Sequence, residues 1–372
     1  MQIKSSYKEK KMIKKVLIGV LLFVASVQAN VSLEHKIGQM LMVGFYGTSA
    51  PEKSQICQDI RRYHIGAVIL FDYNPVNRQK AKNIVSKAQL KQLTSELQAC
   101  SYDGKLLIAV DQEGGRVQRL KSKYGFYGHF PKASDVAKMN QKQIAQTYLK
   151  MSKELKGVGI NYDLAPVVDL DINQRNHVIH GLGRSFGKSP ELVASYASSF
   201  IDAMHHYGVL TALKHFPGHG SSEGDTHKGY VDVTQLWQSK ELQPYKLLNK
   251  KADTVMVAHV YNRHLDANYP ATLSKKTING LLRKKLGFNG VVITDDLQMG
   301  AIRQKYSVEK TLELAINAGN DILLIGNQLD PKRTQSPHSL VSTIETLVTS
   351  HKVDVKRLTE SYQRIQALKK RL

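Results

Sequence analysis

Short apolar runs alternate with longer segments of helical period along most of the chain, and this alternation limits the fold more than any other feature. Eight runs are rich in β-branched and aliphatic residues: Met40–Phe45, Ala67–Phe71, Leu106–Asp111, Asn161–Asp169, Leu210–Phe216, Thr254–Val260, Gly290–Asp295 and Asp321–Gly326. Such runs separated by helical segments are typical of repeated βα units around a parallel sheet. Eight of them in 372 residues predict an α/β fold with a single (β/α)8 TIM barrel, and not an open doubly wound sheet.

Helical segments follow most of the predicted strands. We expect them at Lys80–Ala99, Gln143–Lys156, Pro190–Tyr207, Leu242–Lys250, Lys275–Lys285, Val308–Ala318 and His338–Ser350. No linker rich in proline, glycine or serine divides the sequence, so residues 30–350 are expected to form one barrel domain. The basic amphipathic segment Val355–Leu372, within residues 351–372, predicts a terminal helix packed on that barrel.

The first 29 residues have the pattern of a signal peptide. Lysines precede an apolar stretch from Val16 to Ala25, and Val27-Gln28-Ala29 fits a cleavage site with small residues. Met12 is an alternative start, because Met12 to Ala29 forms a complete signal peptide by itself. The sequence therefore predicts an exported protein, periplasmic or secreted, that keeps no membrane span after cleavage near Ala29.

The formal net charge of the chain is +22, and removal of residues 1–29 lowers it to +17, because that stretch has six lysines and one glutamate. This excess suits electrostatic attraction to an anionic envelope, although a basic surface that only maintains solubility explains it equally well. A nucleic-acid partner would need a concentrated basic stripe or an aromatic platform. The lysines are scattered instead, so we expect no nucleic-acid partner.

Cys57 and Cys100 are the only cysteines. Export would permit a disulfide between them, but their spacing does not decide the matter, and two separate thiols are slightly favoured. Two cysteines cannot form the usual zinc motifs.

Polar residues cluster just beyond several strand ends, where a barrel places its active site. One such residue is Asp295, which follows the apolar run that starts at Gly290. A carboxylate at the barrel mouth can attack an anomeric carbon. Asp295 or Asp296 could instead cap the next helix, and position alone gives these two roles about even weight.

The segment from Lys214 to His227 has the highest density of chemically active side chains. Asp225 lies two residues before His227 and can orient and stabilise its imidazole, which supplies a proton donor and acceptor near neutral pH. Gly220-Ser221-Ser222-Glu223-Gly224 also matches a serine nucleophile elbow, but the strand-to-helix context of that motif is missing. A zinc site is a further alternative, with irregularly spaced ligands at His215, His219, Asp225 and His227. Taken singly, each histidine could also be structural.

Two further segments carry residues suited to sugar hydroxyls. Asp111 ends a strand and is followed by Arg116 and Arg119, and Arg184 lies beyond the fourth strand. Carboxylate and guanidinium groups hold hydroxyls in fixed geometry. For Arg116, a structural ion pair at the rim is the favoured role.

These segments together resemble the glycoside hydrolase family 3 β-N-acetylglucosaminidases, especially the single-domain enzymes of bacterial peptidoglycan recycling. The resemblance runs from about Glu34 to Ile325. Its carriers are Val110-Asp111-Gln112-Glu113-Gly114-Gly115-Arg116-Val117-Gln118-Arg119, Leu164-Ala165-Pro166-Val167-Val168-Asp169, Gly183-Arg184-Ser185-Phe186, Lys214-His215-Phe216-Pro217-Gly218-His219-Gly220 with Asp225-Thr226-His227, and Ile293-Thr294-Asp295-Asp296-Leu297-Gln298-Met299.

The resemblance implies a role for each matching residue. Asp295 would be the nucleophile, and His227 paired with Asp225 would replace the usual carboxylic acid as acid/base. The terminal sugar would be bound by Asp111, Arg119, Arg184, Lys214, His215 and Met299. No metal or other cofactor is implied, and the expected partner is a GlcNAc-containing glycan or muropeptide.

The implied reaction removes terminal β-linked GlcNAc with retention of configuration through a glycosyl-aspartate, with hydrolysis first and phosphorolysis as an alternative. A family 3 β-glucosidase or β-xylosidase is a competing function, as is a non-catalytic wall-binding protein. Many resembling recycling enzymes are cytoplasmic, whereas this chain starts with a predicted signal peptide. Wall fragments outside the inner membrane are therefore the expected substrate.

Overall fold

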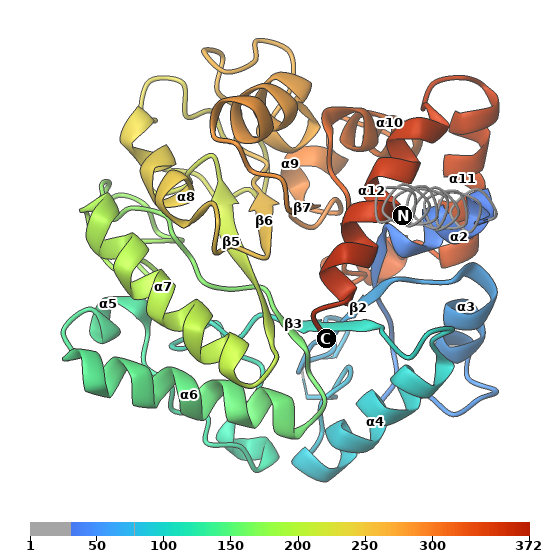
Figure 1. The fold of residues 1–372 in the computed structure, drawn as a ribbon, viewed down its shortest axis with the longest axis horizontal. Coiled ribbons are helices and arrows are strands. Elements are labelled where there is room, and N and C mark those ends of the chain that lie inside the picture. The colour runs from blue at the N-terminus through green and yellow to red at the C-terminus, as the bar shows by residue number, and fades with distance from the viewer. Residues whose placement is uncertain (1–30, 78) are drawn as a thin grey trace, which may run out of the picture.

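The computed structural model describes residues 31–77 and 79–372, so the predicted signal peptide lies outside the described residues. Eight strands occupy the centre and helices surround them (Figure 1). The strands are β1 (Leu41–Gly44), β2 (Ala67–Ile69), β3 (Leu107–Val110), β4 (Tyr162–Asp163), β5 (Leu210–Phe216), β6 (Thr254–Val257), β7 (Val291–Thr294) and β8 (Leu323–Ile325). Every strand residue is buried, because side chains fill the barrel interior and helices cover its outside.

All strand pairs in the barrel are parallel. The hydrogen-bonded order is β7-β6-β5-β4-β3-β2-β1-β8. The seam between β7 and β8 is bridged by the pair Ile293 and Ile322, and the amide of Asp321 donates to the carbonyl of Val292 at 2.7 Å. The prediction of a single (β/α)8 barrel is confirmed.

The helices form an outer ring. They are α2 (Leu33–Gln39), α3 (Gln55–Tyr63), α4 (Lys87–Cys100), α6 (Gln141–Gly157), α7 (Pro190–His206), α8 (Gln243–Leu248), the π-helical η4 (Lys276–Lys285), α10 (Val308–Ala318), α11 (Pro337–Thr349) and α12 (Val355–Lys369). Shorter pieces are α5 (Ala133–Val136), α9 (Gly300–Arg303) and the 3₁₀ turns η1 (Ser122–Tyr124), η2 (Ser239–Leu242), η3 (Ala271–Leu273) and η5 (Pro331–Arg333).

Two predicted elements depart furthest from the observed bounds. The predicted helix Lys80–Ala99 begins only at Lys87, where the Ser86 hydroxyl caps it by accepting from the Gln89 amide. Before that point the chain is held as a loop, because the side chain of Asn83 bonds to the backbone of Phe71. The fourth predicted strand is cut to Tyr162–Asp163, and in the remainder of the predicted run only Val167 forms a further bridge, with Lys214.

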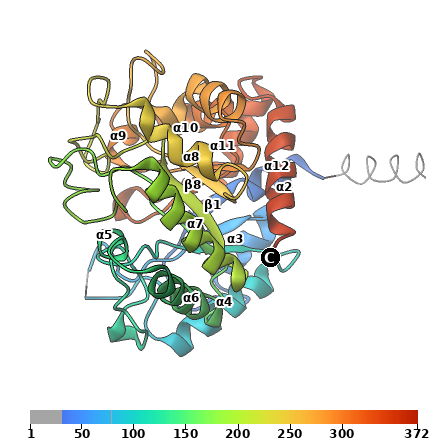
Figure 2. The ribbon, with the colours of Figure 1, turned by 60° about the vertical axis from the view of Figure 1, so that its left-hand side comes forward.

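The two ends of the barrel carry different segments. In Figure 2, α2 and α12 lie at one side of the molecule and α5 and α9 at the opposite side. The terminal helix α12 is held by the fully buried carboxylate of Asp321, which accepts hydrogen bonds from Arg357 at 2.8 Å and Arg364 at 3.1 Å on this helix and from Arg283 of η4 at 2.6 Å. A single carboxylate therefore joins the terminal helix to the seam of the barrel.

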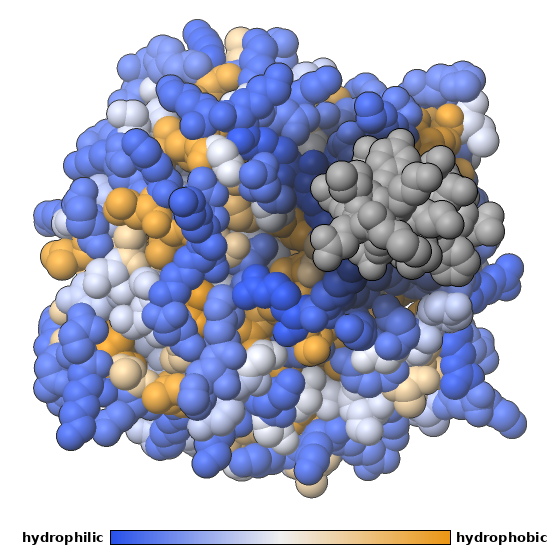
Figure 3. Space-filling view, viewed as in Figure 1, coloured by the Kyte–Doolittle hydropathy of each residue, from blue (hydrophilic) through white to orange (hydrophobic). Residues whose placement is uncertain are grey.

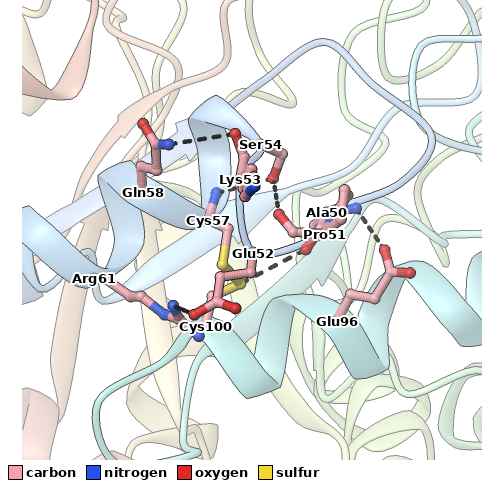
Figure 4. Close-up of a disulfide and its surroundings, with 10 residues drawn as sticks. All are labelled: Ala50, Pro51, Glu52, Lys53, Ser54, Cys57, Gln58, Arg61, Glu96 and Cys100. Atoms are coloured by element: carbon pink, nitrogen blue, oxygen red, sulfur yellow. Dashed lines mark hydrogen bonds and ion pairs between the residues drawn. A yellow bond between two sulfur atoms is a disulfide. The ribbon is translucent and has the colours of Figure 1, made fainter.

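Cys57 and Cys100 form a disulfide, so the slight preference for two separate thiols was wrong (Figure 4). Both residues are buried, on the faces of α3 and α4 that turn toward each other, and their Cα atoms are 5.2 Å apart. The Ala50 amide also donates to Glu96 Oε2 on α4 at 2.6 Å. Sequence spacing could not reveal this pairing, since it arises from the packing of α3 on α4.

The face of the molecule seen in Figure 1 is mostly hydrophilic, with small separate groups of hydrophobic residues (Figure 3). Within residues 31–77 and 79–372, no helix has the length and apolar character needed to cross a membrane.

Candidate active site

A cavity of about 790 Å³ opens at the carboxyl ends of the strands. Asp111 follows β3 and Asp295 follows β7, while Lys214 and His215 lie near the end of β5. All nine predicted site residues line this cavity: Asp111, Arg119, Arg184, Lys214, His215, Asp225, His227, Asp295 and Met299. The structure thus brings together residues that lie as far as 188 positions apart in the sequence.

One wall of the cavity is a network of ion pairs. Lys214 Nζ lies 2.9 Å from Asp111 Oδ1 and 2.7 Å from Glu113 Oε1. Arg119 donates to the second oxygen of Asp111 at 3.1 Å, and Arg184 holds Glu113 through two hydrogen bonds of 2.7 and 2.8 Å. Such two-point contacts fix the orientation of both partners.

The cations of this network keep its carboxylates ionised. Burial alone would raise the pKa of Asp111, but the charges of Lys214 and Arg119 outweigh it and hold that pKa well below its ordinary value. In the same way, burial of Glu113 is outweighed by Arg184 and Lys214, which lower its pKa to about 2. The wall therefore offers permanently charged acceptors and donors to the hydroxyls of a ligand.

His215 is fixed by a buried carboxylate. Its Nδ1 lies 2.6 Å from Asp169 Oδ2, and its Nε2 lies 3.4 Å from Arg184 Nη2. The same Asp169 accepts from the backbone amides of His215 and His219, at 3.3 and 2.8 Å. Asp169 thus holds both the imidazole and the turn that carries it.

Asp225 and His227 form a pair on the loop after β5. His227 Nδ1 lies 2.8 Å from Asp225 Oδ1, which leaves Nε2 of the ring for a ligand. Burial lowers the pKa of His227, but the hydrogen bond to Asp225 and the negative charges of Asp295 and Asp225 outweigh it and raise the pKa above 6.5. His227 can therefore carry a proton at neutral pH.

Asp295 does not cap a helix. The first residue of α9 is Gly300, and the residue before it, Met299, makes no side-chain cap. The neighbour of Asp295, Asp296, uses its carboxylate to accept from the amides of Gln298 and Gly326, at 3.0 and 3.2 Å. The Asp295 carboxylate accepts from the Asp296 amide at 2.8 Å and lines the cavity.

The surroundings of Asp295 keep it ionised. Burial would raise the pKa of Asp295, but the electrostatic influence of the nearby imidazoles of His259, His215 and His227, with the hydrogen bond from the Asp296 amide, outweighs it and lowers that pKa. The ring of His259 is fully buried, and its Nε2 lies 2.9 Å from the carbonyl oxygen of Asp296. An ionised carboxylate thus shares the cavity with an imidazole that can be protonated.

The loop that carries His227 is tied to the segment that follows Asp295. The amide of Gly300 donates to the His227 carbonyl and the amide of Ala301 to the Thr226 carbonyl, both at 3.1 Å. Only a glycine fits here, because a Cβ on residue 300 would lie 2.7 Å from the Lys228 backbone. The positions of His227 and Asp295 are therefore coupled through a short stretch of main chain.

The structure does not support the serine elbow. Ser222 is fully buried, lies in a turn and bonds to His219 Nδ1 at 2.7 Å, and neither residue lines the cavity. Among residues 31–77 and 79–372, no group of three or more His, Cys, Asp or Glu side chains is placed to hold a metal ion.

Arg116 differs from its expected role. It is exposed and lines the cavity, and it makes no ion pair with any residue in the part of the chain that the structure describes. The acids nearest to it in sequence, Asp111 and Glu113, are already paired with Arg119, Lys214 and Arg184.

Glu113, Asp169 and His259 are the important groups that received no role from sequence reasoning. Their partners lie far away in the chain, such as Arg184 for Glu113, which is 71 positions away. Glu113 and Asp169 belong to the motifs that carry the family resemblance, and Glu113 also lies just beyond a predicted strand end, so the sequence offered these two signals.

The fold and the site define a TIM-barrel protein with an ionised carboxylate and an Asp-His pair at the barrel mouth. The glycosyl hydrolase family 3 N-terminal domain model matches residues 32–368, and the chain belongs to this family. It is 34% identical to β-hexosaminidase A of Pseudoalteromonas piscicida over 353 residues, which are 87% of this chain and 56% of that protein.

Solved structures of the family agree with the fold. A glycoside hydrolase family 3 β-N-acetylglucosaminidase from Paenibacillus sp. str. FPU-7 is 32% identical with a TM-score of 0.80, over 92% of this chain and 62% of that one. A β-N-acetylhexosaminidase from Beutenbergia cavernae is 30% identical with a TM-score of 0.76, over 92% and 99%. The chain thus spans less than two thirds of some relatives and nearly all of others.

Proposed function

We propose that this protein is a retaining exo-β-N-acetylglucosaminidase that removes terminal β-linked GlcNAc through a glycosyl-aspartate on Asp295. The observation that carries the proposal is the placement of Asp295 and the Asp225-His227 pair in one cavity, on loops that are hydrogen-bonded to each other. The names of the Pseudoalteromonas, Paenibacillus and Beutenbergia relatives support the substrate class.

In the first step Asp295 attacks the anomeric carbon while His227 donates its proton to the leaving glycosidic oxygen. The C–O bond to the leaving group breaks as the ester bond to Asp295 forms. In the second step neutral His227 takes a proton from water, which displaces Asp295 and releases GlcNAc with its configuration retained. Asp225 stabilises the imidazolium in both steps and fixes the ring so that Nε2 faces the reacting oxygen.

The terminal sugar is assigned to the charged wall of the cavity. Asp111, Arg119, Lys214 and Arg184 form hydrogen bonds to its hydroxyls there, and His215 lies beside Arg184. Met299, which is buried and lines the cavity, supplies an apolar contact. Because Asp169 and Glu113 fix these groups, the wall needs little rearrangement when the sugar binds.

The test is turnover of 4-nitrophenyl N-acetyl-β-glucosaminide by the wild type and the Asp295→Ala variant. We expect turnover by the wild type, severe loss in the variant, and a wild-type preference for the N-acetyl substrate over the glucoside. The opposite preference would favour a β-glucosidase. Equal release of free sugar with and without phosphate, with no sugar phosphate formed, would exclude phosphorolysis, and EDTA insensitivity would exclude a zinc mechanism.

The same proposal includes export and a peptidoglycan-derived substrate. Its supports are the predicted signal peptide at residues 1–29 and the Cys57-Cys100 disulfide, since disulfides persist in oxidising compartments. The remaining charge of +17 would favour attraction to an anionic envelope. Recovery of the full-length precursor in the cytoplasm after cell fractionation would refute export.

A further inference from the structure

Glu241 is a buried acid that the proposed mechanism does not use. It lies on η2, the residue is only 1% exposed, and it forms no ion pair within residues 31–77 and 79–372. Burial raises the pKa of Glu241 to about 7, although hydrogen bonds to its oxygens oppose this effect. A carboxyl group buried without a cation is costly, so the contacts that it makes call for an explanation.

The side chain of Glu241 joins η2 to the loop that follows β5. Its Oε1 accepts from the Gln238 amide at 3.1 Å, next to η2. Its Oε2 accepts from the amides of Gly220 and Ser221, at 3.1 and 3.3 Å. One oxygen of Glu241 is therefore the acceptor for two consecutive amides of the loop.

Residues 217–222 form the start of this loop, which we call the loop root, and every one of them is buried. The loop root packs tightly on both sides. A Cβ on Gly218 would lie 2.6 Å from the Cβ of Glu241, and a Cβ on Gly220 would lie 1.9 Å from the Leu170 carbonyl oxygen. The loop root is thus enclosed between Leu170 and Glu241, and its main chain has little room to shift.

The Asp225-His227 pair lies just beyond the loop root. His227 is exposed and follows Ser222 by five positions. On its other side the loop is fixed by the amide of Gly300, which donates to the His227 carbonyl at 3.1 Å. The loop root therefore sets the direction from which the imidazole enters the cavity. This direction matters for the rate, because a displacement of about 1 Å can lower a catalysed rate about 100-fold.

We infer that Glu241 is a positioning residue for the general acid: through the amides of Gly220 and Ser221 it holds the loop root so that His227 reaches the leaving oxygen. This inference rests on the proposed function. If Glu241 only stabilised the first turn of η2, its loss would affect the fold and not one chemical step.

The experiment compares kcat/KM on 4-nitrophenyl N-acetyl-β-glucosaminide with kcat/KM on a disaccharide of β-linked GlcNAc. Only the disaccharide needs a proton on its leaving oxygen, so the nitrophenyl-to-disaccharide ratio rises when His227 acts less well as an acid. Glu241→Leu leaves two amides of the loop root without this acceptor, and the ratio should rise about three- to tenfold over that of the wild type. Glu241→Gln keeps one oxygen acceptor and should show a smaller rise.

A double variant tests whether Glu241 acts through His227. Without the imidazole no acid remains to be positioned, so Glu241→Leu/His227→Ala should have the same ratio as His227→Ala. Glu96→Leu is the control, because Glu96 on α4 also accepts from a backbone amide, that of Ala50, but does not line the cavity. Its ratio should equal that of the wild type. Denaturant unfolding of each variant identifies the conditions in which it is fully folded, and the kinetics are measured there.

Equal losses on the two substrates in Glu241→Leu would overturn the inference, and so would a ratio in the double variant above that of His227→Ala. If Glu241→Leu does not fold, Glu241→Gln decides the question, and a wild-type ratio in that variant would overturn the inference as well. Absence of wild-type turnover of the nitrophenyl substrate, or a ratio that His227→Ala leaves unchanged, would instead contradict the proposed function.

Discussion

One oxygen of Asp225, Oδ1, accepts hydrogen bonds from both the ring Nδ1 of His227, at 2.8 Å, and the backbone amide of His227, at 3.0 Å. The carboxylate therefore sets the orientation of the imidazole and raises its pKa at the same time. The proposed mechanism requires a protonated His227 and an ionised Asp295 in the free enzyme, so kcat/KM should show a bell-shaped dependence on pH. Its alkaline limb should lie above pH 6.5.

Asp225→Asn should move that alkaline limb to lower pH, because the pKa of His227 falls when the negative charge is removed. The maximum of kcat/KM should also fall, by about 100-fold. The measurement is a pH profile of kcat/KM for both proteins. Asp232→Asn is a matched control, because exposed Asp232 also accepts from a backbone amide two residues ahead but does not line the cavity. An unmoved limb in Asp225→Asn would show that another group titrates there.

Asp295→Ala should lower kcat by at least about 10³-fold, because the substitution removes the carboxylate that forms the proposed covalent intermediate. Added azide should restore turnover of the 4-nitrophenyl substrate, and the glycosyl azide should have the α configuration. Product analysis by NMR checks this outcome. A β-configured azide product would contradict the role of nucleophile.

His227→Ala should affect substrates according to their leaving group. 4-Nitrophenolate leaves without a proton, whereas a sugar alcohol needs one. The loss of kcat/KM should therefore be larger on a disaccharide than on the nitrophenyl substrate, by about 10- to 100-fold. Equal losses on both substrates would mean that His227 contributes through packing or positioning and not as a general acid.

The disulfide should stabilise the fold without affecting the chemistry. It joins residues 43 positions apart, and closure of such a loop removes about 4 kcal/mol of chain entropy from the unfolded state. The double variant Cys57→Ser/Cys100→Ser should lose stability of about this size in denaturant unfolding and should keep its kcat when folded. A reducing agent should destabilise the wild type and leave the double variant unchanged.

Asp321→Asn should destabilise the protein by about 3–5 kcal/mol, because three arginines lose a buried carboxylate. Burial raises the pKa of Asp321, but Arg283, Arg357 and Arg364 outweigh it and lower that pKa. The carboxylate thus stabilises the fold above its unfolded pKa, and this contribution is lost as the pH falls through the lowered folded pKa. Denaturant unfolding should show the same difference in the free energy of unfolding between wild type and variant from about pH 8 to pH 5. The control Asp202→Asn, which removes an exposed carboxylate paired with Lys251 at the surface, should stay close to wild type.

The barrel could be predicted from sequence because most of its strands are apolar on both faces and stand out as short runs, such as β7 (Val291–Thr294). The ends of the elements could not be predicted, because single tertiary contacts decide them. Asn83 holds its segment as a loop against Phe71, although that segment has helical composition. Helix α3 was missed, although its buried residues recur with helical period: Ile56, Cys57, Ile60 and Tyr63.

The residues of the candidate site also fall into two groups, those that the sequence could identify and those that it could not. Side chains that lie at strand ends, such as Asp295, can be identified from position and from the family resemblance. Their supporting groups depend on pairing through space, as in the contact of His215 with Asp169 or of Arg184 with Glu113, and local pattern says nothing about such pairs. The sequence also could not show that Arg116 forms no ion pair within residues 31–77 and 79–372. The reason is that Asp111 and Glu113 are paired with Arg119, Lys214 and Arg184.

The network of ion pairs in the cavity wall can replace the water that a sugar loses when it binds. Asp111 and Glu113 share their charge among Lys214, Arg119 and Arg184, so the wall carries fixed and nearly balanced dipoles. Such dipoles solvate the polar groups of a sugar as bulk water does, but they need not reorient during the reaction. A neutral terminal sugar should consequently bind with little dependence on ionic strength, however basic the outside of the molecule is.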